Sequence, residues 1–271
     1  MLPHGVTEKV DILRLSEEGE RSMEDIVVKE RPLTIFLNGQ ELVTMLCTPA
    51  DQKCLAVGFL LSEGFLKNRE DVESVVFYEE KGVVNVLTSR DVTVPTDLFQ
   101  RRTITSGCGK GAVFYHATDH LQCKPVTAEL YVLPVTIRSL MRQVNRQSEL
   151  FKATGGVHAC ALCQGKNILI FREDIGRHNA IDKVLGECFL NQIRTDQTFI
   201  ITSGRLTSEM LIKVARQNIP ILVSRSAPTD LAITLAKQLN VTLIGFVRGS
   251  RMTLFSKPER ILRTPISKYK V

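Results

Sequence analysis

The pattern of apolar and polar positions divides the chain into two halves. In the first half, short runs of alternating character surround one mostly apolar stretch at 50–63. Alternation with a period of two is typical of half-buried strands. Asn38-Gly39 between the runs 33–37 and 41–47 predicts a two-residue hairpin turn. We expect a second hairpin over 72–88, and hence strands and hairpins around one helix.

The apolar stretch at 50–63 is expected to be a buried helix, because its apolar residues fall on most faces. Thr48 is a favourable N-cap residue and Pro49 suits the first helical position. Gly64 follows as a plausible C-terminal stop.

Helical spacing appears in the second half, first over 136–151 and again from about residue 178. A hairpin is predicted between them, at 157–172. Later, three predicted strands alternate with two helices, the strands at 198–202, 219–224 and 241–246 and the helices at 206–217 and 229–239. Such alternation predicts a parallel βαβαβ unit. We therefore expect an α/β protein with a hairpin-rich region over 1–132 and an α/β domain over 133–271.

Composition narrows the functional classes. The chain has 271 residues, 44% of them hydrophobic and 24% charged, which excludes disordered and collagen-like proteins. Its 35 Lys and Arg against 29 Asp and Glu give a net charge of +6, which suits an acidic or phosphorylated partner. With 6% aromatic residues and no Trp, a nucleic-acid binder is not favoured. No apolar run suits a membrane span or a signal peptide, so we expect a cytoplasmic protein with reduced cysteines.

Hydroxyl and arginine side chains follow each of the three parallel strands, in the loops 203–205, 224–229 and 247–251. In open α/β sheets, ligands bind beyond the carboxyl ends of such strands. Arginine and helix N-termini bind phosphate oxygens, so these loops predict a nucleotide or pyrophosphate ligand. Ser, Thr and Gly are also favoured in ordinary turns between strands and helices, which leaves a structural interpretation open.

Cys108 differs from the other six cysteines in its surroundings. Glycines stand at 107, 109 and 111, Lys110 follows two residues later, and two arginines lie at 101–102. Glycine allows backbone movement and close approach of a ligand, and positive neighbours populate the nucleophilic thiolate. The pattern fits a reactive cysteine, although a spare cysteine in a flexible linker fits it equally well.

The other cysteines favour structural roles. Cys160 and Cys163 lie in a predicted strand, where residues three apart point to opposite faces, so a shared disulfide or metal is disfavoured. No second CxxC motif completes a zinc site, and we expect no metal. Cys188 and Cys47 are expected in the core, whereas Cys54 and Cys123 are uninformative.

A polar segment at 172–183 marks the change from strand to helix. Asp174, Arg177, His178 and Asp182 are candidates to converge on a ligand, and the spacing of four residues predicts that Asp182 orients the His178 imidazole. A solvated helix start with an internal ion pair is the structural alternative. A nucleotide hydrolase or deaminase-like enzyme using His178 with Asp174 or Asp182 is one rival function, although the zinc-deaminase, Walker A and GxGxxG signatures are absent.

Taken together, these segments resemble the FdhD family of formate dehydrogenase accessory sulfurtransferases. The match covers about residues 30–256 and rests on segments in family order, at 105–109, 154–158, 173–183, 202–205, 224–229 and 245–249. The run Glu-Asp-Ile-Gly-Arg-His-Asn-Ala, at 173–180, is the most specific of them.

The resemblance implies a cytidine deaminase-like layered fold and a cytoplasmic sulfur carrier. Such proteins take sulfur from a cysteine desulfurase as a cysteine persulfide and pass it to the bis-molybdopterin guanine dinucleotide form of the molybdenum cofactor, for insertion into the formate dehydrogenase apoenzyme. Cys108 matches the persulfide cysteine. The expected cofactor-binding residues are Phe246, Val247, Arg248, Gly249, Ser250 and Arg251, with Gly204, Arg205 and His178 added from the strand-edge analysis.

Two further points follow from the resemblance. Family members are often described as dimers, so we expect a possible homodimer. Many of them also have a second cysteine three residues after the first, whereas this chain has Gly111 there, which puts a relay within that loop in doubt. A chaperone that only holds the cofactor, without transferring sulfur, is the second rival function.

Overall fold

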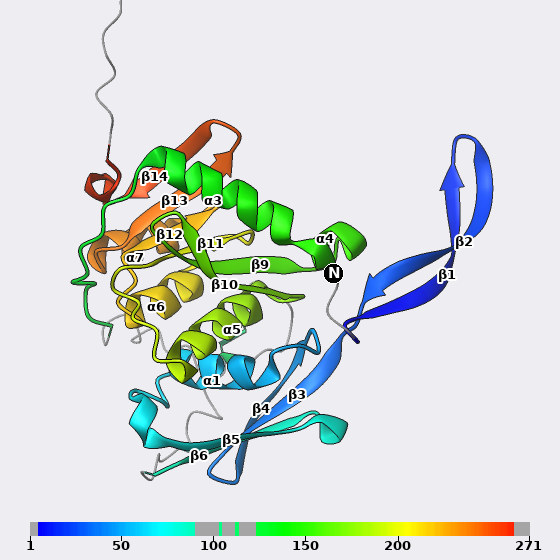
Figure 1. The fold of residues 1–271 in the computed structure, drawn as a ribbon, viewed down its shortest axis with the longest axis horizontal. Coiled ribbons are helices and arrows are strands. Elements are labelled where there is room, and N and C mark those ends of the chain that lie inside the picture. The colour runs from blue at the N-terminus through cyan, green and yellow to red at the C-terminus, as the bar shows by residue number, and fades with distance from the viewer. Residues whose placement is uncertain (1–4, 90–102, 105–111, 114–122, 263–271) are drawn as a thin grey trace, which may run out of the picture.

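The computed structural model describes residues 5–89, 103–104, 112–113 and 123–262. Its largest element is a six-stranded sheet in the order β10-β9-β11-β12-β13-β14. Helix α3 covers one face of this sheet, helices α5 and α1 lie on the other, and a four-stranded sheet lies beyond α1 (Figure 1). This layered α/β arrangement confirms the predicted fold class.

The three central strands form the predicted parallel unit. Strands β11 (Phe199–Thr202), β12 (Ile221–Ser224) and β13 (Thr242–Arg248) pair in parallel, and helices α6 (Ser208–Arg216) and α7 (Asp230–Gln238) connect them. Almost every residue of these strands is buried, as expected for strands covered on both faces. The loops that follow the strands therefore meet at one edge of the sheet.

The flanking strands are antiparallel. Strands β9 (His158–Gln164) and β10 (Asn167–Asp174) form the predicted hairpin beside β11. At the other side, β14 (Arg251–Ser256) returns along β13. Cys160 and Cys163 lie in β9 on opposite faces, the first packed with α5 and α1 and the second with α3. The prediction that these two thiols point to opposite faces of their strand is confirmed.

The second sheet has the order β4-β3-β6-β5. Strands β3 (Arg31–Leu37) and β4 (Gln40–Cys47) form the predicted hairpin, with positive φ angles at Asn38 and Gly39, as the turn requires. Strands β5 (Val72–Tyr78) and β6 (Val83–Thr88) form the second predicted hairpin, and β6 pairs in parallel with β3.

Helices α1 (Gln52–Ser62) and α5 (Arg177–Leu190) cross at very short distance between the two sheets. A Cβ atom on Gly58 would lie 1.8 Å from the Asp182 carbonyl oxygen, and one on Gly186 would lie 1.9 Å from the Cys54 carbonyl oxygen. Only glycine fits at either position, because backbone cannot yield as a side chain can.

Helix α1 begins later than expected. Its N-cap residue is Asp51 in a left-handed conformation, not Thr48. The Thr48 hydroxyl instead accepts a hydrogen bond from the Ile175 N–H at 3.1 Å. The sequence favoured a cap at Thr48 because local preference could not show that a distant segment uses this hydroxyl.

The predicted helix at 136–151 is two helices, α3 (Pro134–Gln147) and α4 (Glu149–Thr154), separated at Ser148. Pro134 occupies the first turn of α3, so the helix begins two residues before the predicted start at 136. The apolar side of α3, Ile137, Leu140, Met141 and Val144, packs on the six-stranded sheet.

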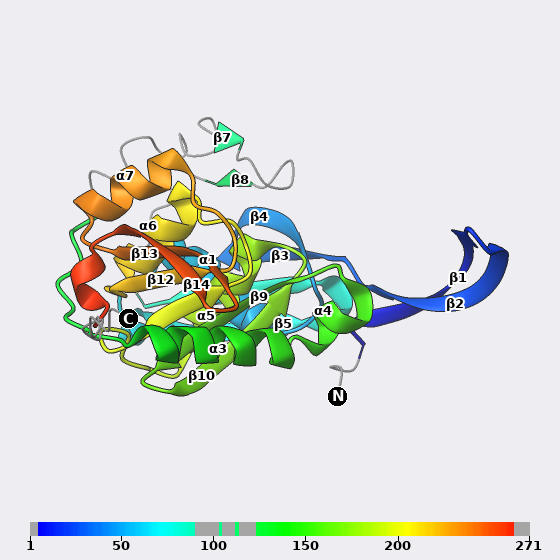
Figure 2. The same cartoon turned by 90° about the horizontal axis from the view of Figure 1, so that it is seen from above.

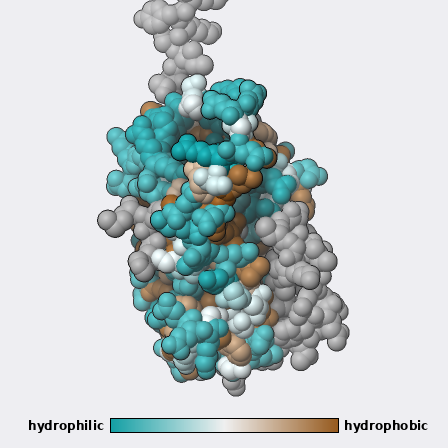
Figure 3. Space-filling view, turned by 90° about the vertical axis from the view of Figure 1, so that its right-hand side faces the viewer, coloured by the Kyte–Doolittle hydropathy of each residue, from teal (hydrophilic) through white to brown (hydrophobic). Residues whose placement is uncertain are grey.

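A hairpin that the sequence analysis did not identify projects from the body (Figures 1 and 2). It consists of β1 (Thr7–Ser16) and β2 (Gly19–Val28), paired along their whole length. Figure 3 looks at the side from which it projects, where apolar residues are scattered among hydrophilic ones. Leu13 and Leu15 on β1 are 57% and 66% exposed.

The main hydrophobic core contains residues from Leu33 to Leu243 and so includes side chains from both predicted domains. The predicted boundary at 132/133 stays a prediction. The shorter elements are β7 (Thr103–Ile104), β8 (Ala112–Val113) and three 3₁₀ turns, at Arg69–Asp71, Glu79–Lys81 and Pro258–Arg260. In the described part of the chain, no helix has the length and apolar character needed to cross a bilayer.

Candidate functional site

The three loops after the parallel strands are bonded to one another. The Ser224 hydroxyl donates to the Gly204 carbonyl at 2.6 Å, and the Phe246 N–H donates to the Ser226 carbonyl at 3.1 Å. The Arg248 Nε donates to the Arg225 carbonyl at 3.0 Å. The prediction that these loops lie together at the carboxyl edge is confirmed as geometry. We call this surface, formed by loops 203–205, 224–229 and 246–251, the strand edge.

The segment 246–251 has an unusual backbone. Phe246 has a φ of 53°, a conformation that bulky residues rarely adopt. Pairing between β13 and β14 shifts register between Gly245 and Arg248, which marks a bulge. The Phe246 side chain is 41% exposed, and Arg248 and Arg251 are opposite each other across the turn at Gly249-Ser250. Such strain often lies at ligand sites.

His178 lies in the first turn of α5, at the side of the strand edge. Its Nε2 is 3.0 Å from the Glu209 carboxylate in the first turn of α6. Burial opposes ionisation of Glu209, but the hydrogen bond from His178 holds the pKa of this carboxyl below its usual value. The predicted pairing of His178 with Asp182 is therefore wrong.

Asp182 is committed to other partners. Lys213 of α6 donates to its two carboxylate oxygens at 2.7 and 2.5 Å, and the Ser62 hydroxyl donates at 2.7 Å. The spacing of four residues correctly indicated that His178 and Asp182 lie on the same side of α5. It did not show that a buried lysine on the next helix lies closer to Asp182 than the imidazole does.

Asp174 is also structural. Its carboxylate forms an ion pair with Lys183 at 2.7 Å, and both side chains are fully buried. It also accepts hydrogen bonds from the Thr48 and Gly176 N–H groups and from the Asn179 amide, at 2.9–3.1 Å. These bonds join the start of α5 to the chain that leads into α1. Neither carboxylate proposed for a hydrolase is thus available to His178.

His158 is not among the predicted site residues, yet it lies beside the strand edge. Its Nδ1 is 3.3 Å from the Ser203 hydroxyl. Burial, and then electrostatic interaction with Arg177 and His178, lowers the pKa of this imidazole. The available signal was its place in the family segment 154–158, two residues after the paired glycines.

The cysteines of the described residues are all free thiols. Burial raises the pKa of Cys54 to about 11 and those of Cys47, Cys163 and Cys188 to about 12. Burial likewise raises the pKa of Cys123, and that of Cys160 well above its usual value. These six thiols stay protonated at neutral pH, so none is suited to be a nucleophile. The expected core positions of Cys47 and Cys188 are confirmed.

Cys108 lies outside the described residues, as do Lys110 and Gly111. Its predicted role as the persulfide cysteine stays a prediction. Among the residues that the structure describes, no three His, Cys, Asp or Glu side chains gather as a metal site would require.

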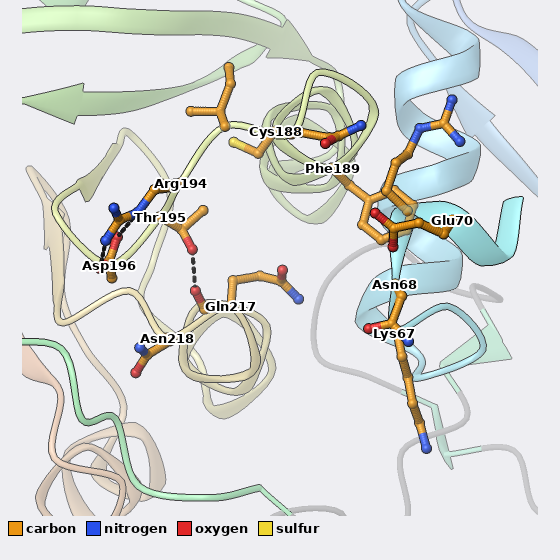
Figure 4. Close-up of a pocket in the computed structure, with 13 residues that line it drawn as sticks. Lys67, Asn68, Glu70, Cys188, Phe189, Arg194, Thr195, Asp196, Gln217 and Asn218 are labelled. Carbon is orange, nitrogen blue, oxygen red and sulfur yellow. Dashed lines mark hydrogen bonds and ion pairs between the residues drawn. The ribbon is translucent and has the colours of Figure 1, made fainter.

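Two cavities lie away from the strand edge. One, of about 490 Å³, lies between the C-terminal ends of α5 and α6 and the segment after α1, with Cys188, Phe189 and Gln217 in its wall (Figure 4). The other, of about 450 Å³, lies near the base of the projecting hairpin and is lined by Lys29, Arg31 and Cys47, among others. Neither contains a predicted site residue.

Comparisons with known proteins identify the relatives of the chain. Residues 28–262 match the model of the FdhD/NarQ family. A Bacillus subtilis (strain 168) protein named "Sulfur carrier protein FdhD" is 41% identical over 257 residues, covering 94% of this chain and 98% of its own. A protein of the same name from Staphylococcus aureus (strain JH9) is 38% identical over 238 residues, covering 88% and 90%.

A solved structure is similar as well. The protein from Desulfotalea psychrophila, described as a formate dehydrogenase accessory protein, superposes with a TM-score of 0.79 at 29% identity. The superposition covers 95% of this chain and 100% of the other. The layered fold is therefore shared with a protein determined by crystallography.

Proposed function

Because this chain belongs to the FdhD/NarQ family, we propose that it is a sulfur carrier required for formate dehydrogenase activity. It receives sulfur from a cysteine desulfurase as a persulfide on Cys108. It then passes the sulfur to molybdenum in the bis-molybdopterin guanine dinucleotide cofactor, before the cofactor enters the formate dehydrogenase apoenzyme. Both steps belong to the cytoplasm, where thiols are kept reduced.

The division of the seven cysteines is the observation that carries this proposal. Six thiols have a pKa raised by burial, in most cases far above neutral pH. Cys108 has instead the sequence setting of a reactive thiol, with glycines on both sides and Lys110 nearby. Elimination thus supports the same residue that the resemblance assigned.

The transfer to Cys108 is balanced without an outside oxidant. The Cys108 thiolate attacks the terminal sulfur of the desulfurase persulfide. The bond to that sulfur forms on Cys108, and the desulfurase cysteine leaves as a thiolate, which gives a Cys108 persulfide. The cationic neighbours in the sequence favour the anionic forms at both ends of this step.

The strand edge supports the cofactor half of the proposal. Phosphate groups of a guanine dinucleotide need bidentate cations and N–H donors. Arg205, Arg225, Arg248 and Arg251 all lie on the loops of this edge, and the exposed Phe246 ring offers a surface for a base. We assign cofactor binding to residues 246–251 together with Gly204, Arg205 and His178.

Mapping of the transferred sulfur tests the proposal. The purified protein is incubated with a cysteine desulfurase and ³⁵S-labelled cysteine, alkylated and digested with trypsin. Cleavage after Arg102 and Lys110 releases residues 103–110, in which Cys108 is the only cysteine. The label is expected on this peptide. Label on residues 153–166, which contain Cys160 and Cys163, would place the persulfide on β9 and contradict the proposal.

Removing two arginines from the strand edge is expected to weaken guanine nucleotide binding. Each charge-assisted hydrogen bond contributes ~1.5–3 kcal/mol, and about 1.4 kcal/mol corresponds to tenfold in affinity. The double variant Arg248→Ala/Arg251→Ala should therefore bind GDP at least about tenfold more weakly in calorimetry. Arg194→Ala is the matched control, since Arg194 lies in the wall of the distant cavity. Equal affinity in all three proteins contradicts the assignment of the strand edge.

The two rivals fare differently. Hydrolase chemistry through His178 loses its proposed carboxylates, because Asp174 and Asp182 each bind a buried lysine. A chaperone that only holds the cofactor uses the same strand edge, so it differs from the sulfur carrier in needing no reactive thiol. The Cys108→Ala variant separates these two.

A further inference from the structure

His158 is held in a defined position at the start of β9. The Ser203 hydroxyl oxygen is 3.3 Å from its Nδ1 and accepts a hydrogen bond from the Ala159 N–H at 3.0 Å. The Ser203 N–H donates in return to the Ala159 carbonyl at 3.0 Å. A hydroxyl rotates freely, so Ser203 can donate to a neutral imidazole or accept from a charged one. The contact thus suits both charge states of His158.

The groups that act on His158 come from three further segments. Arg177 and His178 belong to α5, Arg205 to the loop after β11, and Asp174 to the end of β10. Asp174 is the one carboxylate among these groups, and it is paired with Lys183. Burial is the main cause that lowers the pKa of His158, and the positive charges around the imidazole lower it further.

This cluster is within reach of a ligand. Arg205 is exposed, and His158, Ser203 and His178 are half-buried. Gly204, between Ser203 and Arg205, packs closely against the Arg177 side chain. A Cβ atom on Gly204 would be only 2.8 Å from the Arg177 Cβ. The loop that carries Arg205 is thereby kept close to the start of α5, where Arg177 is buried.

We propose that His158, Arg177 and Arg205 form a subsite for the diphosphate group of a nucleotide, and that His158 takes up a proton when this group binds. The inference rests on the proposed function for the identity of the ligand. Burial and the surrounding positive charge both disfavour the imidazolium, and an anion placed among these cations reverses the effect of the charge, so that uptake of a proton from solvent becomes more favourable. The resulting imidazolium adds a third cation to the subsite.

The sign of the pH dependence follows from this linkage. Binding raises the pKa of His158 from a free value that lies below the ordinary 6.5. Affinity is then highest at pH values below the free pKa and falls as the pH rises through the bound pKa. One linked proton limits the decrease to about tenfold per pH unit. A histidine that serves only to pack the strand gives no such dependence.

Calorimetry with GDP-mannose tests the proposal on the full chain. Its diphosphate is a diester and has no ionisation near neutral pH, so any proton taken up belongs to the protein. Titrations at pH 7 in buffers of different ionisation enthalpy give the number of protons bound per ligand. The wild type is expected to take up a positive fraction of one proton. His158→Gln should take up none, whereas the control Arg194→Ala, in the wall of the distant cavity, should take up as much as the wild type.

NMR measures the pKa of each histidine in the wild-type protein and so tests the proton uptake without a variant. The protein has five histidines, and titration of their imidazole signals with and without GDP-mannose gives each pKa. We expect one signal, with a low pKa in the free protein, to move upward on binding. Binding without proton uptake, or uptake that persists in His158→Gln, overturns this inference and leaves the sulfur carrier intact. Failure of the wild type to bind GDP-mannose overturns both this subsite and the proposed cofactor site, whereas sulfur labelling of Cys108 would still stand.

Discussion

Replacing Cys108 by alanine is expected to reduce sulfur acceptance from a desulfurase to background and to abolish activation of formate dehydrogenase. The persulfide needs a thiolate at neutral pH, and burial raises the pKa of each of the six other thiols. No other described cysteine is suited to replace it. Labelled sulfur on the protein and formate oxidation by the reconstituted enzyme are the two measurements.

Cys54→Ala is the matched control for this variant. Cys54 is the least buried of the described cysteines, yet burial raises its pKa to about 11, so its loss should leave sulfur acceptance unchanged. Guanine nucleotide affinity and the unfolding midpoint of Cys108→Ala should match the wild type, which separates a chemical loss from a folding defect. Full activation of formate dehydrogenase by Cys108→Ala would support the chaperone that only holds the cofactor.

Replacing Lys183 by methionine is expected to destabilise the protein by ~3–5 kcal/mol, the usual effect of leaving one partner of a buried ion pair without the other. Lys183 and Asp174 are both fully buried and 2.7 Å apart. The lysine also donates to the carbonyls of Thr48 and Glu173, at 3.3 and 3.2 Å. Its removal loosens the junction between α1 and α5. Denaturant unfolding measures the loss, which is a large share of the ~5–15 kcal/mol of a typical domain.

Two controls accompany this variant. Lys9→Met removes an exposed partner of Glu24 on the projecting hairpin and should leave the unfolding midpoint unchanged. The double variant Asp174→Asn/Lys183→Met removes both charges and should recover part of the loss, because no isolated charge stays buried. A Lys183→Met protein as stable as the wild type, or a double variant less stable than Lys183→Met, would show that the pair does not act as inferred.

Most polar side chains of the motif at 173–183 are therefore structural, although the polarity of the segment suggested a ligand site. Asp174, Asp182 and Lys183 are buried and hold α5 against α1 and α6. Its helix-start residues differ, because the buried Arg177 and the half-buried His178 both act electrostatically on His158 beside the strand edge. A specific run of residues can thus identify a family while most of its polar side chains serve the fold.

The crossing of α1 and α5 is a second feature whose residues could not be interpreted from the sequence. Gly58 and Gly186 are each required by the backbone of the opposite helix, within 2 Å of where a Cβ atom would stand. In the sequence, both look like ordinary glycines that lower helix propensity. Glycine is required at both positions by a contact between segments more than a hundred residues apart.

The sequence by itself determined the order of the central strands and helices, both hairpins of the second sheet and the opposite faces of Cys160 and Cys163. These are local properties, since turn chemistry and hydrophobic periodicity act over a few residues. It also distinguished Cys108 by its immediate neighbours. The tertiary structure alone decided that His178 pairs with Glu209, that Thr48 bonds Ile175 rather than capping α1, and that His158 meets Ser203. Periodicity tells which face of an element a side chain occupies, but its partner depends on how distant segments pack, and that choice is made by burial and charge in three dimensions.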